Sequence, residues 1–538
     1  MLTQSRYRKL VPTNGSANRL SPARSRMRIV AALAMCAVLL GGSGSIAVAA
    51  GARHHGIPSA VLKISSPFLP LNLNPVLDGY SVFDMYTLPA YSSLIFATPK
   101  GGQYKPELAK SFGYIGKGNK RFTMTLRSGI RFSNGTPMTA QDVVKSIKYF
   151  QTANGPEAST LSAIQTATAK GKYTINLTLS SSNPLMPLLF SQEYTSGEII
   201  NPKAIDKPSM MSDATWGAGP YMLDPSQTVL NDHYTYVPNP YYYAKSKLKY
   251  GEITIKYIVN PTSALQAIKT GQVDVALGDP STADAAKSAG LGVYPVQTAT
   301  QAFFLRDRGG KVLKPLGDVR VRQALNYAVD RKVITNAIFG KYAAVTDQMC
   351  QERTDLYDKA LTNAYPYNPK KAKQLLAAAG YKKGFTLTVL SNGGFNDTFA
   401  EAVAGYLSKV GVKVVLDSEQ PAQFNIDNFG QKFAVTSSAY GGAPGWFESQ
   451  LLLEPKGVLN PFHSSDKTID KLLNQLSAAK PGSPQERTIA HAIEVRVVKL
   501  AWFLPVMSFD EIFYATKSVG GLVMDFTGTS DLLDWYPK

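Results

Sequence analysis

Alternating hydrophobic and polar residues predict strands in several parts of this chain. Phe122, Met124 and Leu126 alternate with polar neighbours, and residues 173–179 repeat the pattern. A period of two is typical of a strand that buries one face. Residues 60–64 predict an earlier strand.

A helical pattern follows the strand that contains Phe122. Val143, Ile147 and Phe150 lie three or four residues apart, so one helix face is hydrophobic. Thr139 with Asp142 can cap this helix, because a hydroxyl and a carboxylate can satisfy the free backbone N–H groups of its first turn.

Further helices and strands alternate along the second half of the chain. Residues 264–277 predict a helix that leads into a short strand. Asp318 can cap a long helix over residues 319–340. A helix over residues 368–380, with proline near its start, leads into a strand at residues 385–390. This alternation predicts the α/β class.

Length and charge narrow the possible classes of protein. With 538 residues the chain is long enough for two or three domains. Its formal charge is +19, and residues 1–50 contribute seven Lys and Arg without any acid. We expect the remaining basic residues to be dispersed over a solvated surface, because no dense basic run occurs. Nucleic acid is not an expected partner either, because the leader described next predicts an exported chain.

The N-terminus has the pattern of a secretory signal. An uncharged apolar run at residues 29–40 follows several arginines and precedes a tail of small residues. This order predicts a signal over residues 1–50, cleaved near Ala49 or Ala50. An uncleaved leader that anchors the protein is an alternative, and so is a translation start at Met27.

The two cysteines do not predict a disulfide. Cys36 lies inside the apolar run, and Met35 before it fits a lipidation site poorly, so lipidation is a minor alternative. Cys350 is then the only cysteine of the mature chain, and we expect a structural thiol.

Residues 106–150 combine the strand and the capped helix in one dense motif. Their order resembles the hallmark segment of the family 5 extracytoplasmic solute-binding proteins, the dipeptide, oligopeptide and nickel-chelate receptors of ABC importers. The matching residues are Leu108, Ala109, Phe122, Leu126, Arg127, Gly129, Phe132, Gly135, Thr139, Ala140, Asp142 and Val143.

Other segments resemble the same family, in the family's order. They are residues 73–75, 91–95 (a helical segment), 217–221, 237–243, 264–277, 318–330 and 368–380. Within them we expect Arg320, Arg322 and Asp330 to face water or to pair locally.

The resemblance implies an α/β, two-lobe periplasmic-binding-protein-like fold with hinge strands and an extra subdomain in the first lobe. The expected parts are a signal at 1–50, lobe I at 51–95, 215–302 and 505–538, the extra subdomain at 96–214, and lobe II at 303–504.

The resemblance also implies a function. We expect a substrate-binding protein of an ABC importer, which captures a peptide-like or other small solute by hinge closure and delivers it to a permease pair with ATPases. The protein is expected outside the cytoplasm, as a monomer without cofactor or metal. The mature chain has no HExxH pair, P-loop or GxSxG elbow, so we expect no enzyme. A secreted hydrolase and a ligand-sensing receptor without a transport role remain alternatives.

Residues 437–447 are the strongest candidate for a ligand contact. Relatives carry pocket aromatics in the matching stretch, which points to Tyr440, Trp446 and Phe447. In peptide receptors of the family an Asp there pairs with the peptide ammonium, but this chain has Ala443 before the matching proline. A buried ammonium without a carboxylate is costly. Ordinary free-amino peptides are therefore disfavoured unless an acid comes from elsewhere.

Weaker candidates lie in both lobes, and for each of them a structural role is the alternative. They are Asn74, Tyr86, Tyr91 and Trp216 from the first lobe, and Phe395 with Asn396 from the second. Trp502 and Phe503 lie where the chain returns to the first lobe, and we expect them to pack in the hinge or a core.

Overall fold

The computed structural model describes most of the chain beyond the predicted leader. The described residues are 58–70, 72–78, 85–98, 103–153, 155–352, 354, 356–441, 445–523 and 532–538. The predicted signal, the residue pair His54-His55 and the position of Ala443 lie outside them.

The first lobe contains five strands of a mixed sheet in the order β11-β1-β10-β9-β8. Its centre is β1 (Val61–Ser66), which runs parallel to both β10 (Glu252–Tyr257) and β11 (Val275–Gly278). The strands β9 (His233–Pro238) and β8 (Tyr221–Leu223) extend it antiparallel. The early strand predicted at residues 60–64 is confirmed.

A separate four-stranded antiparallel sheet lies within the segment expected to form the extra subdomain. Its order is β4 (Ala109–Tyr114), β5 (Arg121–Leu126), β7 (Thr174–Leu179) and β6 (Ile164–Lys170). The helix α3 (Ala140–Thr152) packs on it, with Val143, Ile147 and Phe150 buried.

The predicted cap of α3 is present. The Asp142 carboxylate accepts the Thr139 backbone N–H at 2.7 Å and the Thr139 hydroxyl at 2.8 Å. The predicted strand with Phe122 and the predicted helix after it are therefore both confirmed.

The second lobe continues the sheet in the order β15-β14-β16. The strand β14 (Phe385–Ser391) runs parallel to β15 (Val412–Ser418) on one side and to β16 (Val435–Gly441) on the other. The predicted helix over residues 368–380 is α10 (Pro369–Ala378), and Gly380 after it has a φ of +90°, as a helix C-terminus often requires.

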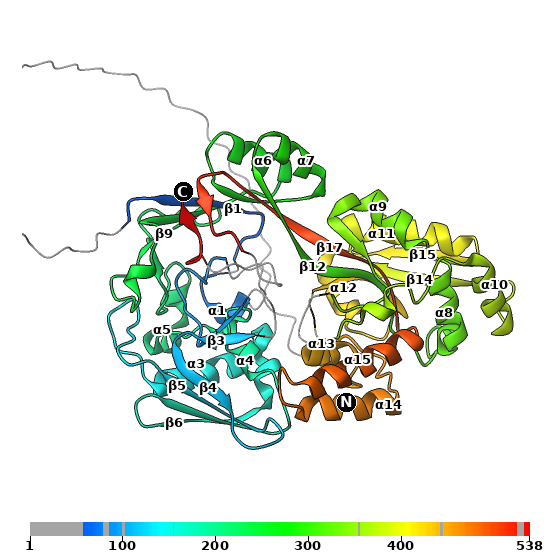
Figure 1. Cartoon of the computed structure of the whole chain (residues 1–538), viewed down its shortest axis with the longest axis horizontal. Coiled ribbons are helices and arrows are strands. Elements are labelled where there is room, and N and C mark those ends of the chain that lie inside the picture. The colour runs from blue at the N-terminus through cyan, green and yellow to red at the C-terminus, as the bar shows by residue number, and fades with distance from the viewer. Residues whose placement is uncertain are drawn as a thin grey trace, which may run out of the picture. The chain divides into compact units, whose positions relative to one another are not determined.

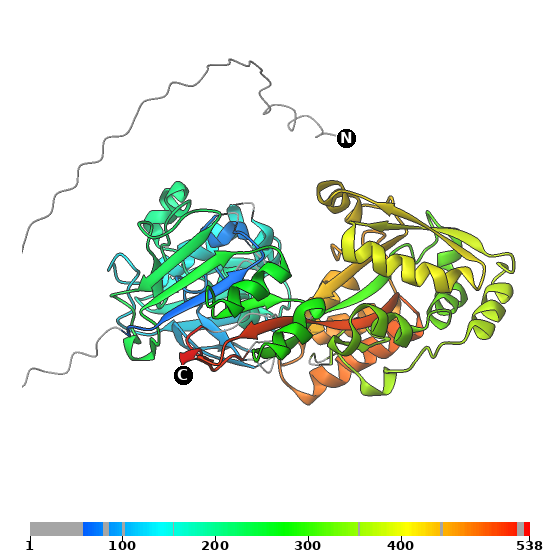
Figure 2. The ribbon, with the colours of Figure 1, turned by 90° about the horizontal axis from the view of Figure 1, so that it is seen from above.

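Two long strands connect the lobes. The strand β12 (Gly292–Leu305) pairs with β16 of the second lobe, and β17 (Phe503–Ala515) pairs with β11 of the first. The two strands also pair with each other along most of their length. In both ribbon views they run side by side from one lobe to the other (Figures 1 and 2), which confirms the predicted two-lobe fold with hinge strands.

The remaining elements surround these sheets. They are α1 (Pro75–Asp78), α4 (Met186–Leu189), α5 (Pro202–Asp206), α6 (Pro261–Lys269), α7 (Pro280–Ser288), α8 (Val319–Tyr327), α9 (Arg331–Ile338), α11 (Gly394–Ser408), α12 (Pro421–Asn428), α13 (Gly445–Leu452), α14 (Lys467–Ala478) and α15 (Pro484–Lys499), with the short strands β2 (Ile95–Ala97), β3 (Tyr104–Pro106), β13 (Ala343–Val345), β18 (Val519–Gly520) and β19 (Tyr536–Pro537). Within the described parts of the chain, no helix combines the length and apolar character that a bilayer span needs.

The helical segment predicted at residues 91–95 is wrong. The backbone N–H groups of Ala90 and Tyr91 close a turn on the Thr87 carbonyl, and Ile95 begins strand β2. Tyr91, Leu94 and Ile95 are all buried. Apolar spacing alone does not distinguish a helix from a short segment that is buried on all sides.

The long helix predicted over residues 319–340 is in fact two helices, α8 and α9. The Asp330 carboxylate accepts the Val333 backbone N–H at 3.2 Å and so caps a new helix at Arg331. The expectation for Arg322 is also wrong, because its side chain is buried and donates to the carbonyls of Leu316 and Leu500. Arg320 does pair locally, with Asp318 at 2.6 Å.

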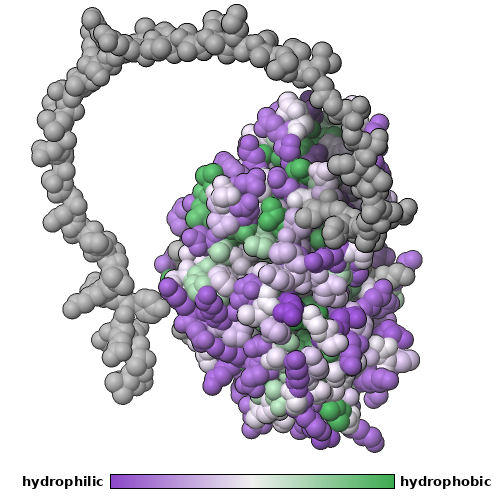
Figure 3. Space-filling view, turned by 90° about the vertical axis from the view of Figure 1, so that its left-hand side faces the viewer, coloured by the Kyte–Doolittle hydropathy of each residue, from purple (hydrophilic) through white to green (hydrophobic). Residues whose placement is uncertain are grey.

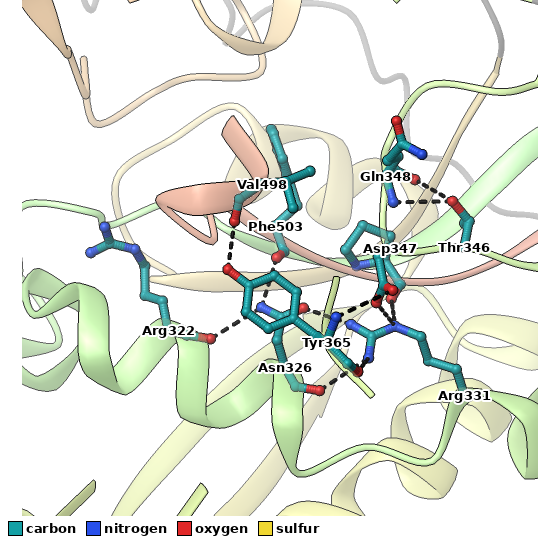
Figure 4. Close-up of polar contacts among 10 residues, drawn as sticks. Arg322, Asn326, Arg331, Thr346, Asp347, Gln348, Tyr365, Val498 and Phe503 are labelled. Carbon is teal, nitrogen blue, oxygen red and sulfur yellow. Dashed lines mark hydrogen bonds and ion pairs between the residues drawn. The ribbon is translucent and has the colours of Figure 1, made fainter. Parts of the chain in front are cut away.

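A buried polar network ties α8 and α9 to the start of β17 (Figure 4). Arg331 forms an ion pair with Asp347 at 2.9 Å and donates to the Pro505 carbonyl at 2.7 Å. Asn326 accepts from Arg331 and donates to the Phe503 carbonyl at 3.0 Å. Burial raises the pKa of the Asp347 carboxyl although Arg331 acts in the opposite direction. The network fixes one end of a hinge strand to the second lobe.

One face of the molecule can be inspected for surface character. On the face in Figure 3, hydrophilic side chains predominate and hydrophobic ones form small separate groups.

Candidate ligand-binding site

The segment from β16 to α13 carries three of the predicted aromatic contacts. Strand pairing places Tyr440 opposite Thr300 of hinge strand β12. Further along the chain, Trp446 and Phe447 lie in the first turn of α13, each only 7% exposed. The chain therefore brings all three rings to the region where the hinge meets the second lobe.

Phe447 contacts an aromatic residue from the predicted extra subdomain. Its ring lies 5.4 Å from that of Tyr194, at an interplanar angle of 74°, an edge-to-face arrangement that aromatic pairs favour. Trp446 and Phe447 belong to the same hydrophobic cluster as Met349 and Cys350. The predicted aromatic wall is therefore a junction between segments far apart in the sequence.

Trp446 has an unusual environment for an indole. Its Nε1–H group is buried and has no hydrogen-bond partner among the residues that the structure describes. A buried donor without an acceptor is unfavourable, and buried tryptophans usually find a partner. The role of this nitrogen in ligand binding stays a prediction.

Buried acids lie beside these aromatic rings. Burial, and next to it the charge of Glu448, raises the pKa of the Tyr440 hydroxyl. Burial raises the pKa of Tyr194 in the same way, with contributions from Tyr440, Glu157 and Glu193. Glu448 and Glu193 are each 3% exposed. Negative groups thus approach the tyrosines from both lobes.

Glu157 shows how the first-lobe part of this region is held. Its carboxylate accepts the backbone N–H groups of Thr195 at 2.9 Å and Ser196 at 2.6 Å. Burial raises its pKa to about 7, although these hydrogen bonds act in the opposite direction. The carboxylate fixes the backbone directly after Tyr194.

Asn396 is tied to the hinge. Its side-chain oxygen accepts from Gln301 of β12 at 2.8 Å, and its carbonyl accepts from the Ser437 hydroxyl at 3.0 Å. The other amide atom of Gln301, Oε1, is buried without a partner in the described part of the chain. The side chain of Phe395 lies outside that part.

The first-lobe candidates lie apart from this group and serve the packing of their own lobe. Asn74 caps α1 and donates to the Tyr149 hydroxyl at 2.8 Å. Tyr86 and Tyr91 are fully buried, and their hydroxyls donate to the carbonyls of Phe68 and Leu73. The half-buried Trp216 donates to the Met210 carbonyl at 3.1 Å. Their roles in ligand binding stay predictions.

A cavity of about 540 Å³ lies along the hinge strands. Tyr294, Gln297 and Asp510 line it from β12 and β17, and Glu352 closes it from the loop after β13. Burial raises the pKa of the neighbouring Glu511 to about 7. This part of the hinge is acidic.

The site chemistry is suited to binding. In the described ranges, no three His, Cys, Asp or Glu side chains are grouped as a metal site would need. Aromatic rings and carboxyl groups lie near one another in this region, and their role in ligand binding stays a prediction.

The sequence analysis missed several of these residues. Tyr194, Glu193, Glu448 and Gln301 were not predicted. Glu448 directly follows Phe447, so a search for an acid that continued past residue 447 would have found it. Tyr194 and Glu193 come from a distant segment, and no local signal indicates them.

Comparisons with known proteins identify similar chains. A sequence profile for "Bacterial extracellular solute-binding proteins, family 5 Middle" matches residues 103–453. The glutathione-binding protein GsiB of Salmonella typhimurium is 25% identical over 445 residues, which cover 77% of this chain and 82% of GsiB.

Solved structures share the fold at lower identity. NikA from Brucella suis, in complex with Fe(III)-EDTA, superposes with a TM-score of 0.76 at 22% identity, over 89% of this chain and 100% of NikA. The periplasmic binding protein DppA from Helicobacter pylori, in complex with the peptide STSA, gives 0.74 at 17% identity, over 89% and 98% of the two chains.

Proposed function

Because the chain belongs to the bacterial extracellular solute-binding proteins of family 5, and so is a solute-binding protein of the ABC-importer class, we propose that it captures a small, peptide-like solute with a cationic amine. Members of this family are extracytoplasmic binding proteins, not enzymes. The observation that carries the proposal is the buried Glu448 carboxylate beside Tyr440, directly after Trp446 and Phe447.

The acid changes the expectation about amines. A buried ammonium needs a carboxylate partner, and none precedes Glu448 in the stretch from residue 428 onward. Glu448 supplies that charge in α13, and Glu193 adds a second acid beside Tyr194. A peptide-like solute is further supported by the similarity to GsiB, which is named a glutathione-binding protein.

The mechanism that we propose is closure about the hinge strands. A solute that touches Tyr194 from one side and Tyr440 or Trp446 from the other gains contacts only when the two lobes close. Differential affinity of this kind shifts the population toward the closed state. The binding protein acts as a monomer outside the cytoplasm. It passes the unchanged solute to a permease that works with ATPases.

A charge-neutral substitution tests the role of Glu448. For a stabilising free-amino peptide found by a thermal-shift screen, Glu448→Gln should weaken binding by about 10- to 150-fold, because hydrogen bonds to charged groups contribute roughly 1.5–3 kcal/mol. The matched control is Glu401→Gln, an exposed acid of α11. N-acetylation of the peptide should weaken binding to the unchanged protein and have little further effect on the Glu448→Gln variant.

Two outcomes would contradict the proposal. Equal affinity of the parent protein for free and acetylated peptides would show that the cationic amine is not recognised. Mass-spectrometric detection of a cleaved or modified solute would favour the hydrolase alternative.

A further inference from the structure

A second cavity lies in the second lobe, apart from the residues of the proposed solute site. It has a volume of about 420 Å³ and is bounded by the loop after β12, by residues 462–466 and by residues 500–502. None of the residues discussed for solute binding lines it. Arg308, Lys311 and Arg322 contribute three cationic side chains to its wall.

Among the described residues, the hydrogen-bond acceptors of Arg308 are neutral. It is 7% exposed, and its guanidinium donates to the Trp502 carbonyl at 3.3 Å and to Asn460 Oδ1 at 3.2 Å. The same group lies 4.3 Å from the centre of the Trp502 ring. Its Nη2 is buried and lacks an acceptor among the described residues. The positive charge is therefore desolvated, and no carboxylate in the described ranges forms an ion pair with it.

Arg322 repeats the pattern next to it. It is 5% exposed and donates to the carbonyls of Leu500 at 3.1 Å and Leu316 at 2.6 Å. Burial lowers the pKa of Arg308, with repulsion by Arg322 as the next cause, and burial lowers that of Arg322 to about 10. Two buried cations thus face the same space.

The acids that line the cavity are engaged elsewhere. The Asp307 carboxylate accepts the backbone N–H groups of Lys311, Val312 and Leu313 at 2.7–2.8 Å. Asp466 forms an ion pair with Arg496 at 2.7 Å. In the part of the chain that the structure describes, no ion pair joins a carboxylate to any of the three cations.

Arg331 in the same lobe shows the usual solution. That buried arginine has its own carboxylate, Asp347, at 2.9 Å. An uncompensated buried charge is unfavourable, so a charge partner from outside the chain would be strongly favoured at Arg308, whereas the charge of Asp318 partly offsets that of Arg322. The exposed Lys311 stands at the same cavity, where it can meet an incoming anion.

We propose that this cavity binds a multivalent oxyanion, a phosphate or a polycarboxylate, through Arg308, Arg322 and Lys311. Guanidinium groups match both anions, because two of their N–H groups can donate to two oxygens of one planar carboxylate or one tetrahedral phosphate. The anion would join the loop after β12 to Trp502, directly before β17, and so brace both hinge strands at their second-lobe ends.

The full-length protein tests the site by calorimetry with inorganic phosphate and with citrate, against sodium chloride at equal ionic strength. We expect saturable binding of phosphate or of citrate, with a thermal shift that chloride does not produce. Stronger binding of phosphate would identify a phosphate site, and stronger binding of citrate a polycarboxylate site. Lys311→Ala should weaken binding by about fivefold, and Arg308→Met by more than about tenfold. Lys314→Ala, an exposed lysine of the same loop outside the cavity wall, should leave it unchanged.

The affinity of Arg308→Met is interpreted only if circular dichroism shows that this variant is folded. If it is not folded, the affinity of Lys311→Ala tests the proposal. Binding no stronger than that of chloride would overturn the proposal. Equal affinities of the parent protein, Lys311→Ala and a folded Arg308→Met would overturn it as well.

Discussion

Glu494 is a buried acid whose ionisation should weaken the fold. It lies in α15, is 2% exposed, and has a side-chain oxygen, Oε1, without a partner among the described residues. Burial raises its pKa from 4.5 to about 7, against a hydrogen bond from the Cys350 thiol, and Asp358 adds to the rise. The native pKa is above the unfolded one, so native stability falls as pH rises from about 4.5 to about 7.

The magnitude follows from the difference between the two pKa values. One pKa unit corresponds to about 1.4 kcal/mol, so an ionised Glu494 costs the native state roughly 3 kcal/mol at pH 8. Glu494→Gln removes this titration. Relative to the parent protein, the variant should gain roughly 2–3 kcal/mol in free energy of unfolding between pH 5 and pH 8.

Urea unfolding of both proteins at a series of pH values measures this difference. Any cost of packing the new amide is independent of pH, so the slope of the difference tests the reasoning and its offset does not. Glu401→Gln, at an exposed site of α11, is the control and should show no such slope. A difference between Glu494→Gln and the parent that stays constant from pH 5 to pH 8 would refute the assignment.

The same structure supports three other predictions. Trp446→Phe should weaken solute binding by about fivefold, since the ring stays packed but the Nε1–H donor is lost, and unchanged affinity in calorimetry would return Trp446 to a packing role. Asp347→Ala should lower the free energy of unfolding by about 3–5 kcal/mol, because it leaves Arg331 buried without its partner, whereas Asp284→Ala, at an exposed pair with Lys341, should have little effect in the same urea titration. Envelope material should carry an N-terminus near Gly51 on sequencing, and an intact leader in a cytosolic fraction would contradict the predicted signal.

Features set by neighbouring residues were predictable from the sequence. The cap of α3 depends on Thr139 and Asp142, which are three residues apart, and the alternation in β5 and β7 needs only one buried face. The motif at residues 106–150 also predicted the solute-binding class and the two-lobe fold, and the family match at residues 103–453 with the structural comparisons confirms both.

Features set by distant residues were not predictable. The break between α8 and α9 is a local exception: the apolar period runs through both helices, while the non-helical backbone of Asp330 and its cap on Val333 begin a new helix. Arg322 carries a charge that favours water, but carbonyls from Leu316 and Leu500 surround it in the fold. A single charged residue in a helical pattern does not reveal such partners.

The candidate site divides in the same way. Tyr440, Trp446 and Phe447 are close in the sequence, and a family pattern indicated them together. Tyr194 meets Phe447 across a long separation in the sequence, and only the fold brings the two rings to 5.4 Å.

The position of β17 in the sheet has a consequence for the order in which the protein can form. This strand lies between β11 and β12, and it is among the last segments of the chain to be synthesised. Until Ala515 has left the ribosome, β11 and β12 each lack a neighbour, and neither lobe can complete its sheet. Synthesis from the end of β12 at Leu305 to Ala515, at about 5–20 residues per second, takes on the order of 10–40 seconds. A chain shortened to end before Phe503 would keep two open strand edges, which are templates for aggregation. The pairing of hinge strand β17 with β11 and β12 is therefore also one of the last steps in forming the fold.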